Sequence, residues 1–561
     1  MKRAVARAAS LLTLGIAACT SAQGPSTKSA MPAAPAGTVK TVAAISDADL
    51  RQRLYAVADD SMGGRVTGSP GHIKVTQYLA GELKRLGLRP AGDNGTYFQN
   101  VPFVKRAIAN ATISANGHNL IVWDDYVPIL PNAPLRSFDN AQVVYGGIAQ
   151  DTTTMITREQ AAGKFVVLLN RGANPFSRGT APGTRLETAA AVATVQQPAA
   201  LGIYRRFLRT PGPSFAGGDQ AAAQHGISMA ISADAAAQLM GVTIDSTLAV
   251  GTTGNAVRGD ITATEEPVTA RNVVAILPGS DPRVSGQYVA IGAHSDHVPL
   301  RLPPVDHDSL RAFNAAMRVK RLAVGDRQLT PAERAEIKVN VDSLRALRPA
   351  RLDSINNGAD DDGSGTVAVL EIAEALAGAQ QKPARSILFV WHVAEELGLF
   401  GARYFADHPT VPRDSIVAQL NNDMIGRGGV GEELAGGPDY VQLIGWRRLS
   451  NELGDIIESV NKQQPLPFKF DLQYDAAGHP EQYYCRSDHY EYARFGIPIA
   501  FFSTGNHGDY HQVTDEPQYV DYTKLRNVAQ LVHDVGVRIA NLDHRLKVDG
   551  PRPDPKGQCV Q

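Results

Sequence analysis

A set of strongly apolar runs between residues 272 and 502 constrains the fold of this chain more than any other feature. The runs are Asn272–Leu277, Tyr288–Ile291, Ser386–Val390 and Pro498–Phe502. They are apolar on both faces and alternate with helical patterns, which is typical of strands buried between two layers of helices. We therefore predict an α/β fold, with a mixed, mostly parallel sheet flanked by helices.

Residues that bind zinc well follow these runs closely along the chain. His294 follows the second run, Glu395 and Glu396 follow the third, and His511 lies beyond the fourth. Asp423 follows a further apolar stretch in the same way. Because ligands of an open α/β sheet gather at the carboxyl ends of its strands, we expect these side chains to meet in one crevice.

The acidic motifs are more informative together than separately. Asp360, Asp361 and Asp362 precede a helical pattern, where a single acid would be an ordinary cap, but three adjacent acids exceed what a cap requires. Glu395 and Glu396 at the rim of a buried strand need cations or protonation to offset their repulsion. The predicted metal ligands are two imidazoles and three carboxylates, a set that suits two zinc ions: His294, Asp361, Glu396, Asp423 and His511.

Two further residues are predicted to support this site. Glu395 remains free for proton transfer if Glu396 faces a metal, because neighbouring residues alternate in direction. Asp296 lies on the same face as His294 in a His-x-Asp pattern, so its carboxylate can accept the imidazole N–H and orient the ring.

With all five ligand motifs matched, the chain resembles the co-catalytic two-zinc aminopeptidases, which include the leucine-type enzymes of Vibrio and Streptomyces. The resemblance covers roughly Ser46 to Asn541 and implies the zinc exopeptidase fold that glutamate carboxypeptidases share. It also implies a distribution of ligands. One zinc would take His294 and Asp423, the other Glu396 and His511, and Asp361 would bridge them.

The same resemblance implies a mechanism and a substrate class. Glu395 corresponds to the general base, Tyr510 to the tyrosine that stabilises the oxyanion, and Asp296 to the supporting acid. It further implies a cis peptide bond between Asp361 and Asp362. Two zinc ions carry four positive charges against three on the carboxylates, which favours a bridging hydroxide near neutral pH. We expect an aminopeptidase that hydrolyses N-terminal residues from peptides.

Other functions remain open at this stage. A carboxypeptidase or dipeptidase of the same fold would need basic groups to grip a carboxylate, and the arginine-rich stretch 299–357 could supply them, although a solvated helix face is the simpler interpretation. A one-zinc glutaminyl cyclase and a non-catalytic receptor-like module fit less well. The net charge of -1 gives no reason to expect nucleic acid as a partner. The sequence leaves the oligomeric state undetermined.

The N-terminal region predicts export and a lipid anchor. Lys2 and Arg3 precede an apolar stretch that ends in small residues before Cys19, as in a bacterial lipoprotein signal. We expect residues 1–19 to be this signal, with an acylated Cys19, and residues 20–45 to be a flexible tether. We then expect the protein to be held in the bacterial cell envelope, at the outer membrane.

The rest of the chain is predicted to contain one catalytic domain with two interruptions. Residues 46–130 and 264–545 would form the zinc peptidase domain and 546–561 a tail. Residues 131–263 have a strand-rich pattern, with strands near Ala141–Ala149 and Gly163–Leu169, and resemble a protease-associated domain. Residues 299–357 are predicted to be a helical hairpin that starts a helix at Thr330. Cys485 and Cys559 either pair or remain as two thiols.

Overall fold

The computed structural model describes residues 41–129, 137–151, 153–171, 183–209, 212–216, 227–324, 329–428 and 437–561. The signal and most of the tether predicted from the sequence lie outside these described residues. Within them, no helix is both long enough and apolar enough to cross a membrane.

The predicted sheet is present and is mixed but mostly parallel. Its strands in the catalytic part follow the order β17-β16-β18-β15-β11-β14-β10. β11 pairs in parallel with both β14 and β15, β15 pairs in parallel with β18, and β16 pairs in parallel with β17. β10 is antiparallel to β14, and β16 is antiparallel to β18. These strands are β10 (Thr253–Leu277), β11 (Tyr288–His294), β14 (Ser386–His392), β15 (Ile416–Asn422), β16 (Tyr440–Ile444), β17 (Lys469–Asp471) and β18 (Ile499–Ser503).

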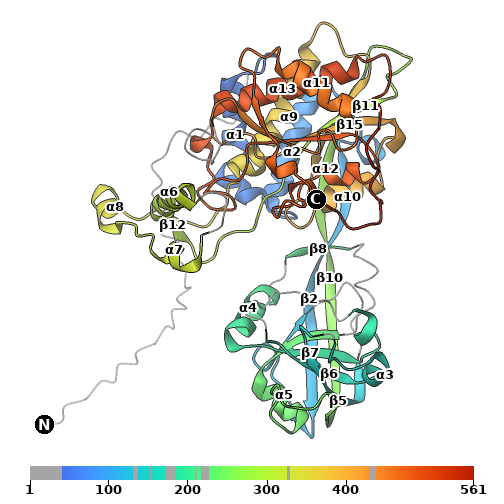
Figure 1. The fold of residues 1–561 in the computed structure, drawn as a ribbon, viewed down its shortest axis with the longest axis vertical. Helices are drawn as coiled ribbons and strands as arrows, with labels where there is room; N and C mark the ends of the chain where they lie inside the picture. The colour runs from blue at the N-terminus through green and yellow to red at the C-terminus, as the bar shows by residue number, and fades with distance from the viewer. Residues whose placement is uncertain are drawn as a thin grey trace, which may run out of the picture. The chain divides into compact units, whose positions relative to one another are not determined.

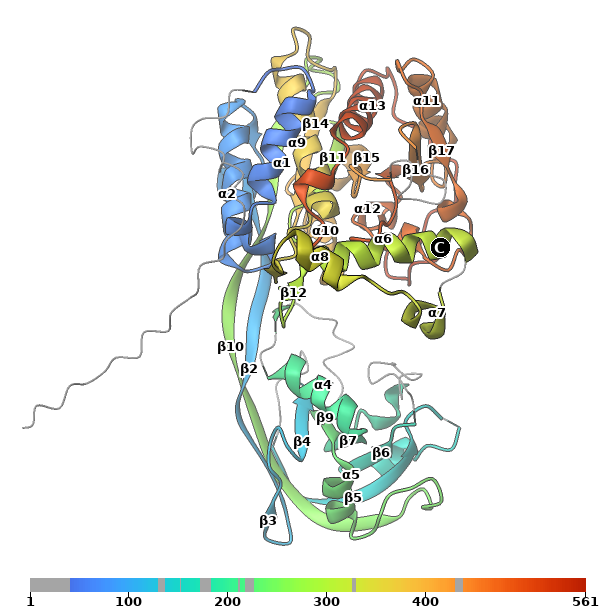
Figure 2. The same cartoon turned by 90° about the vertical axis from the view of Figure 1, so that its left-hand side faces the viewer.

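Helices cover both faces of this sheet. Alternate residues of its strands belong to two separate hydrophobic clusters, so each face packs against its own helices. Val273 and Val289 pack in one cluster with five helices, whereas Val274 and Ala290 pack in another with two helices (Figures 1 and 2). The first layer consists of α1 (Asp47–Val57), α2 (Pro70–Arg85), α9 (Gly365–Gly378), α11 (Asn451–Asn461) and α13 (Tyr522–Ala540). The second consists of α10 (Phe400–Asp407) and α12 (His489–Ala493).

The two opening helices begin and end where local sequence signals place them. The side chain of Ser46 accepts a hydrogen bond from the backbone N–H of Asp49 and so caps α1. α2 begins at Pro70 and ends just before Gly87, whose φ of +73° suits a residue without a side chain. The strand β1 (Arg89–Pro90) then pairs with β10.

The strand-rich segment has a hydrophobic core of its own, which includes Phe165, Ile227 and Leu239. β2 and β10 pair along their length, from Phe98 and Val273 to Ala115 and Val257. The further elements are β3 (His118–Asn119), β4 (Tyr126–Ile129), β5 (Phe138–Ile148), α3 (Arg158–Ala161), β6 (Phe165–Leu169), β7 (Ala191–Val195), α4 (Pro198–Leu208), β8 (Pro213–Phe215), β9 (Ile227–Ile231) and α5 (Ala233–Met240). β5, β6, β7 and β9 are successive parallel neighbours.

The insertion at residues 299–357 is helical, but it is not the predicted hairpin. Thr330 does cap a helix, yet that helix ends at Ala335, and residues 341–347 form a separate short helix in which Val341 is exposed. The side chain of Asn340 caps this second helix. The elements are β12 (Val305–Asp306), α6 (His307–Val324), α7 (Pro331–Ala335), α8 (Val341–Leu347) and β13 (Leu352–Asp353) (Figure 2).

A disulfide joins Cys485 to Cys559, so the two sulfurs that the sequence left open do pair. The C-terminal residue, Gln561, accepts a hydrogen bond from the backbone N–H of Tyr484 and donates to the carbonyl of Tyr474. The tail is therefore fastened beside the segment that leads into α12.

Candidate metal centre and active site

The carboxyl ends of the parallel strands deliver the predicted metal ligands to one place. His294 is the last residue of β11, Asp423 directly follows β15, and Glu396 follows β14. His511 lies in the loop beyond β18, and Asp361 lies in the turn that leads into α9. All five side chains predicted from the sequence lie together, as the strand order requires.

The first group of candidate ligand atoms consists of His294 Nε2, Asp361 Oδ1 and Asp423 Oδ1. His294 Nε2 lies 3.2 Å from Asp361 Oδ1 and 3.6 Å from Asp423 Oδ1. These three residues are buried, with exposed fractions of 1%, 3% and 8% for His294, Asp361 and Asp423. Two carboxylates without water around them need a nearby positive charge.

The second group consists of His511 Nε2, Glu396 Oε2 and the other oxygen of the Asp361 carboxylate, Oδ2. His511 Nε2 lies 3.0 Å from Asp361 Oδ2 and 3.0 Å from Glu396 Oε2. Asp361 Oδ2 and His511 Nε2 are both buried, and neither has a hydrogen-bond partner among the residues that the structure describes. Buried polar atoms without a hydrogen bond are rare, and a metal ion bound to both of these atoms would satisfy them.

Both groups fit a zinc ion. Two donors on one tetrahedral zinc lie about 3.3 Å apart, because each zinc–ligand bond is about 2.0–2.1 Å long. The distances within the two groups range from 3.0 Å to 3.6 Å. Asp361 is the residue that both groups share, through different oxygens.

Glu395 lies beside this cluster without belonging to either group. Its Oε2 is 3.9 Å from His294 Nε2, and its backbone N–H donates to Asp296 Oδ1 over 3.2 Å. Burial raises the pKa of Glu395 well above its usual value; His294 opposes this rise and the charges of Glu396 and Asp423 add to it. The carboxyl group is thus suited to hold a proton in transit.

Tyr510 lies over the second group. Its ring stacks on that of His511, with ring centroids 3.8 Å apart. Burial and the charges of Asp361, Glu396 and Glu395 raise the pKa of Tyr510, so its hydroxyl stays protonated and can donate a hydrogen bond. Tyr510 lines a pocket together with Glu395, Glu396 and Met424.

Asp296 contacts His294 differently from the sequence prediction. The ring atom His294 Nδ1 lies 3.1 Å from the backbone carbonyl of Asp296, whereas the nearer carboxylate oxygen is 3.8 Å away. The Asp296 carboxylate instead accepts hydrogen bonds from the hydroxyl of Thr67 and from the backbone of Glu395. Asp296 therefore contacts His294 through its main chain and Glu395 through its side chain.

Sequence reasoning missed two side chains that hold the ligands in position. His297 Nδ1 lies 2.8 Å from Glu396 Oε1, and Ser487 Oγ donates to Asp423 Oδ2 over 2.7 Å. His297 is three residues beyond His294, and Ser487 lies just before α12. Only their partners could not be seen, because Ser487 is separated from Asp423 by 64 positions and His297 from Glu396 by 99.

The bridging segment is held by its backbone. The peptide bond between Asp361 and Asp362 is cis, as the family resemblance implies. The backbone N–H groups of Asp360 and Asp361 donate to the carboxylate of Asp515, and the Arg65 guanidinium donates to the carbonyls of Asn357 and Gly358. Asp515 and Arg65 therefore hold the backbone of the segment that carries Asp361.

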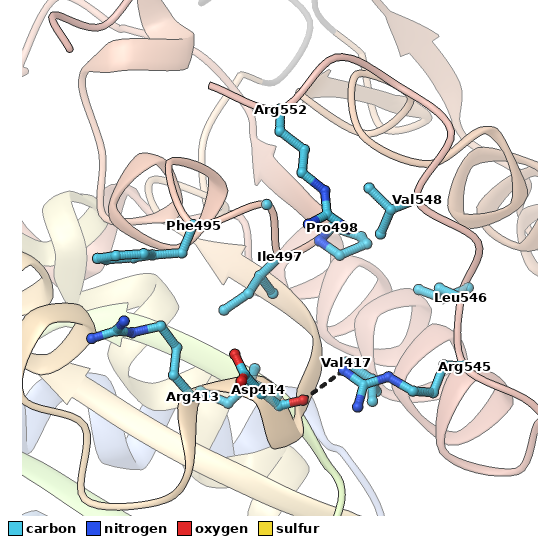
Figure 3. Close-up of a pocket in the computed structure, with 12 residues that line it drawn as sticks. Arg413, Asp414, Val417, Phe495, Ile497, Pro498, Arg545, Leu546, Val548 and Arg552 are labelled. Carbon is cyan, nitrogen blue, oxygen red and sulfur yellow. Dashed lines mark hydrogen bonds between the residues drawn. The ribbon is translucent and has the colours of Figure 1, made fainter. Parts of the chain in front are cut away.

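A separate pocket lies at the opposite ends of the strands, where β15 and β18 begin (Figure 3). Arg413, Arg545 and Arg552 surround apolar residues such as Ile497, and Arg545 donates to the carbonyl of Asp414 over 2.7 Å. None of the predicted metal ligands lines this pocket. It is therefore distinct from the metal centre.

Comparisons with known proteins show what this chain is similar to. Residues 272–536 match the model described as peptidase family M28. That segment contains all five predicted ligands. Among solved structures, the chain is similar to an aminopeptidase from Aneurinibacillus sp. strain AM-1, with 18% identity, a TM-score of 0.47 and coverage of 91% of this chain and 98% of that chain. It is also similar to BSAP, a zinc aminopeptidase from Bacillus subtilis, with 16% identity, a TM-score of 0.47 and coverage of 92% and 100%.

The curated relatives match over shorter stretches. The chain is 44% identical to leupeptin-inactivating enzyme 1 of Streptomyces exfoliatus over 80 residues, 14% of this chain and 18% of that protein. It is 33% identical to leucine aminopeptidase 1 of Paracoccidioides brasiliensis over 183 residues, 31% of this chain and 44% of that protein. A probable leucine aminopeptidase of Arthroderma otae is 29% identical over 201 residues, 29% of this chain and 56% of that protein. The matches thus span about half or less of each relative's length.

Proposed function

We propose that this chain, which belongs to peptidase family M28 over residues 272–536, is a two-zinc aminopeptidase that removes N-terminal residues from peptides. The observation that carries the proposal is the position of Asp361, whose two oxygens face separate groups of buried ligand atoms. His294 and Asp423 would hold one zinc with Asp361, and Glu396 and His511 would hold the other.

The zinc ions, when bound, would supply Lewis acidity toward the peptide carbonyl and lower the pKa of water. Glu395 would accept a proton from the attacking water and pass it to the leaving amine. The Tyr510 hydroxyl would donate a hydrogen bond to the oxygen of the carbonyl as negative charge develops there. Each of these two side chains lines the pocket that borders the ligands.

The pocket supports binding at a peptide's N-terminus. Met424, Tyr483 and Phe501 supply apolar or aromatic surface to the pocket, and Glu395 is the lining acid that is not a proposed zinc ligand. A free α-amine could bind beside Glu395, while the first side chain buries its apolar atoms against the other residues. An N-acetylated peptide lacks that amine's charge.

A carboxypeptidase is the second candidate, because Arg486 lines the same pocket. A guanidinium group binds carboxylates well, so it could hold the C-terminus of a short peptide. The leucine aminopeptidases to which this chain is similar favour the aminopeptidase.

One pair of measurements tests the proposal. Purified protein should contain two zinc ions per chain and should cleave a leucyl peptide with a free N-terminus but not the same peptide after N-acetylation. Equal cleavage of both forms, with loss of cleavage on C-terminal amidation, would select the carboxypeptidase. A protein that binds no zinc and cleaves neither form would contradict both candidates.

We also propose that the protein is exported and anchored through an acylated Cys19, and that residues 131–263 form a protease-associated-like domain. The basis for the anchor is the signal motif before Cys19, which lies outside the described residues. Metabolic labelling with a fatty-acid analogue should mark the wild-type chain. It should not mark a Cys19→Ala variant.

A further inference from the structure

The insertion at residues 299–357 is fastened into one unit by a short neck and by ion pairs to one buried carboxylate. β12 pairs with β13, so the insertion leaves and rejoins the catalytic domain at one point. Asp308 is only 8% exposed and accepts hydrogen bonds from Arg348 and Arg351 over 2.6–3.1 Å. Such bidentate pairs hold α6 in a defined orientation relative to the returning chain.

From this unit, α6 reaches the loop that carries Tyr510 and His511. Arg311 and Asn314 of α6 both donate hydrogen bonds to the carboxylate of Asp509, the latter over 3.0 Å. Asp509 directly precedes Tyr510 and is only 3% exposed. An added methyl group on Gly508 would lie 3.3 Å from Cβ of Asn314, so helix and loop are in close contact.

Every oxygen of the Asp509 carboxylate is engaged, and the donors come from three directions. Oδ1 accepts from Asn314 and from the Thr514 hydroxyl, and Oδ2 accepts from Arg311 and from Arg427. Asp509 is therefore a fixed anchor for the loop.

Further contacts of the insertion flank the same loop. Arg301 donates to the side chain of Gln512, next to His511, over 3.3 Å. The Arg311 guanidinium also lies over the ring of Tyr519, 3.6 Å from its centroid. The insertion thus contacts the loop on both sides of the metal ligand.

We propose that α6 is a positioning element for the metal centre, in which Arg311 and Asn314 hold Asp509 so that His511 and Tyr510 face the bridging carboxylate. The inference rests on the proposed function for the role of His511 as a ligand. Residues around a metal site that orient its ligands typically change metal affinity or activity by about 10–100-fold when removed. Neither α6 residue touches a ligand or a substrate group directly; both act through Asp509.

The test compares two variants of α6 by zinc affinity as well as by turnover. Arg311→Ala combined with Asn314→Ala should weaken one of the two zinc-binding steps about tenfold, in a titration against a competing chelator, and should lower kcat with little change in KM. The other step, which depends on His294 and Asp423, should keep its affinity. Because Arg427 still bonds to Asp509, we expect the variant to fold.

Lys320→Ala is the matched control, because Lys320 is on the same helix but donates to Glu333 and Glu336 of the insertion. It should leave both zinc steps and kcat unchanged. In a His511→Ala background the Arg311 and Asn314 changes should cause no additional loss of zinc. Arg311→Lys combined with Asn314→Ala keeps a positive charge and should bind zinc more tightly than the double alanine variant.

Two results would overturn the inference while leaving the proposed function intact. One is a double variant whose melting temperature falls but whose zinc steps and kcat match those of Lys320→Ala. The other is equal weakening of both zinc steps, which indicates general destabilisation. If the wild-type chain binds two zinc ions but cleaves no peptide, the proposed function fails and the zinc titration still decides this inference. A wild-type chain without zinc at His511 would overturn both.

Discussion

The hydroxyl of Ser487 donates a 2.7 Å hydrogen bond to Oδ2 of Asp423, whose other oxygen faces His294. Ser487 in turn accepts a hydrogen bond from the side-chain amide of Asn421. This chain of bonds fixes which oxygen of Asp423 turns toward the metal site. A ligand that is oriented in advance loses less freedom when the ion binds.

Replacing Ser487 by alanine should therefore weaken zinc binding at the His294 group by about tenfold. The zinc affinity of the second group, which contains His511 and Glu396, should be unchanged. A titration against a competing chelator should therefore show one altered step. Ser503→Ala is the control, since Ser503 lines the same pocket but its hydroxyl bonds to the carbonyl of Met424. An unchanged titration for Ser487→Ala would show that the hydrogen bond does not orient the ligand.

The two adjacent glutamates should respond differently to substitution. Glu395→Gln keeps a side chain of similar shape outside both ligand groups, so it should retain two zinc ions and lose about 10²–10⁴-fold in kcat. Glu396→Ala removes a ligand atom that lies 3.0 Å from His511 Nε2 and should lose one zinc ion. Metal analysis and kcat measured on the same samples check both. Equal zinc loss in the two variants would mean that their roles are wrongly assigned.

Tyr510→Phe should lower kcat by about 10²-fold or more, because it removes the hydroxyl proposed to stabilise the developing oxyanion. KM should change little, since the ring that stacks on His511 is retained. Tyr483→Phe removes a hydroxyl from another tyrosine of the same pocket and serves as the comparison. Similar kcat values for the two variants would argue against a special role for Tyr510.

Stability at acid pH should depend on His72, a buried residue of α2. Burial lowers the pKa of His72 to about 4, whereas an unfolded histidine has a pKa of about 6.5. Between these values the unfolded chain binds a proton that the folded chain does not. The stabilising effect is therefore complete above about pH 6.5 and is lost as the pH falls toward about 4.

Between pH 7.5 and pH 5.5, wild type should accordingly lose about 1 kcal/mol more unfolding free energy than His72→Gln. Urea unfolding of the zinc-free proteins at both pH values measures this difference. His118→Gln changes an exposed histidine of β3 and should behave as wild type. If His72→Gln has the same pH dependence as wild type, burial does not keep His72 neutral.

The local sequence was sufficient to predict the α/β sheet and the side chains that meet at its edge. Strands such as β14 are apolar on both faces, and the acids follow them directly, so the sheet and the edge where Glu396 and Asp423 meet could be predicted. The helices of the strand-rich segment could not be predicted from its sequence. Its helix α4 begins at Pro198 in a stretch rich in alanine and proline that reads equally well as a loop.

The sequence by itself determined which residue types can bind metal and which strands bring them together, because strand burial and the side-chain period are local properties. The tertiary structure alone decided that His297 bonds to Glu396, that Ser487 bonds to Asp423, and that Asp509 is held from α6. Such pairs join segments far apart in the chain, and their hydrogen bonds depend on directions and distances of a few tenths of an ångström. A pattern of residue types carries no information on those distances.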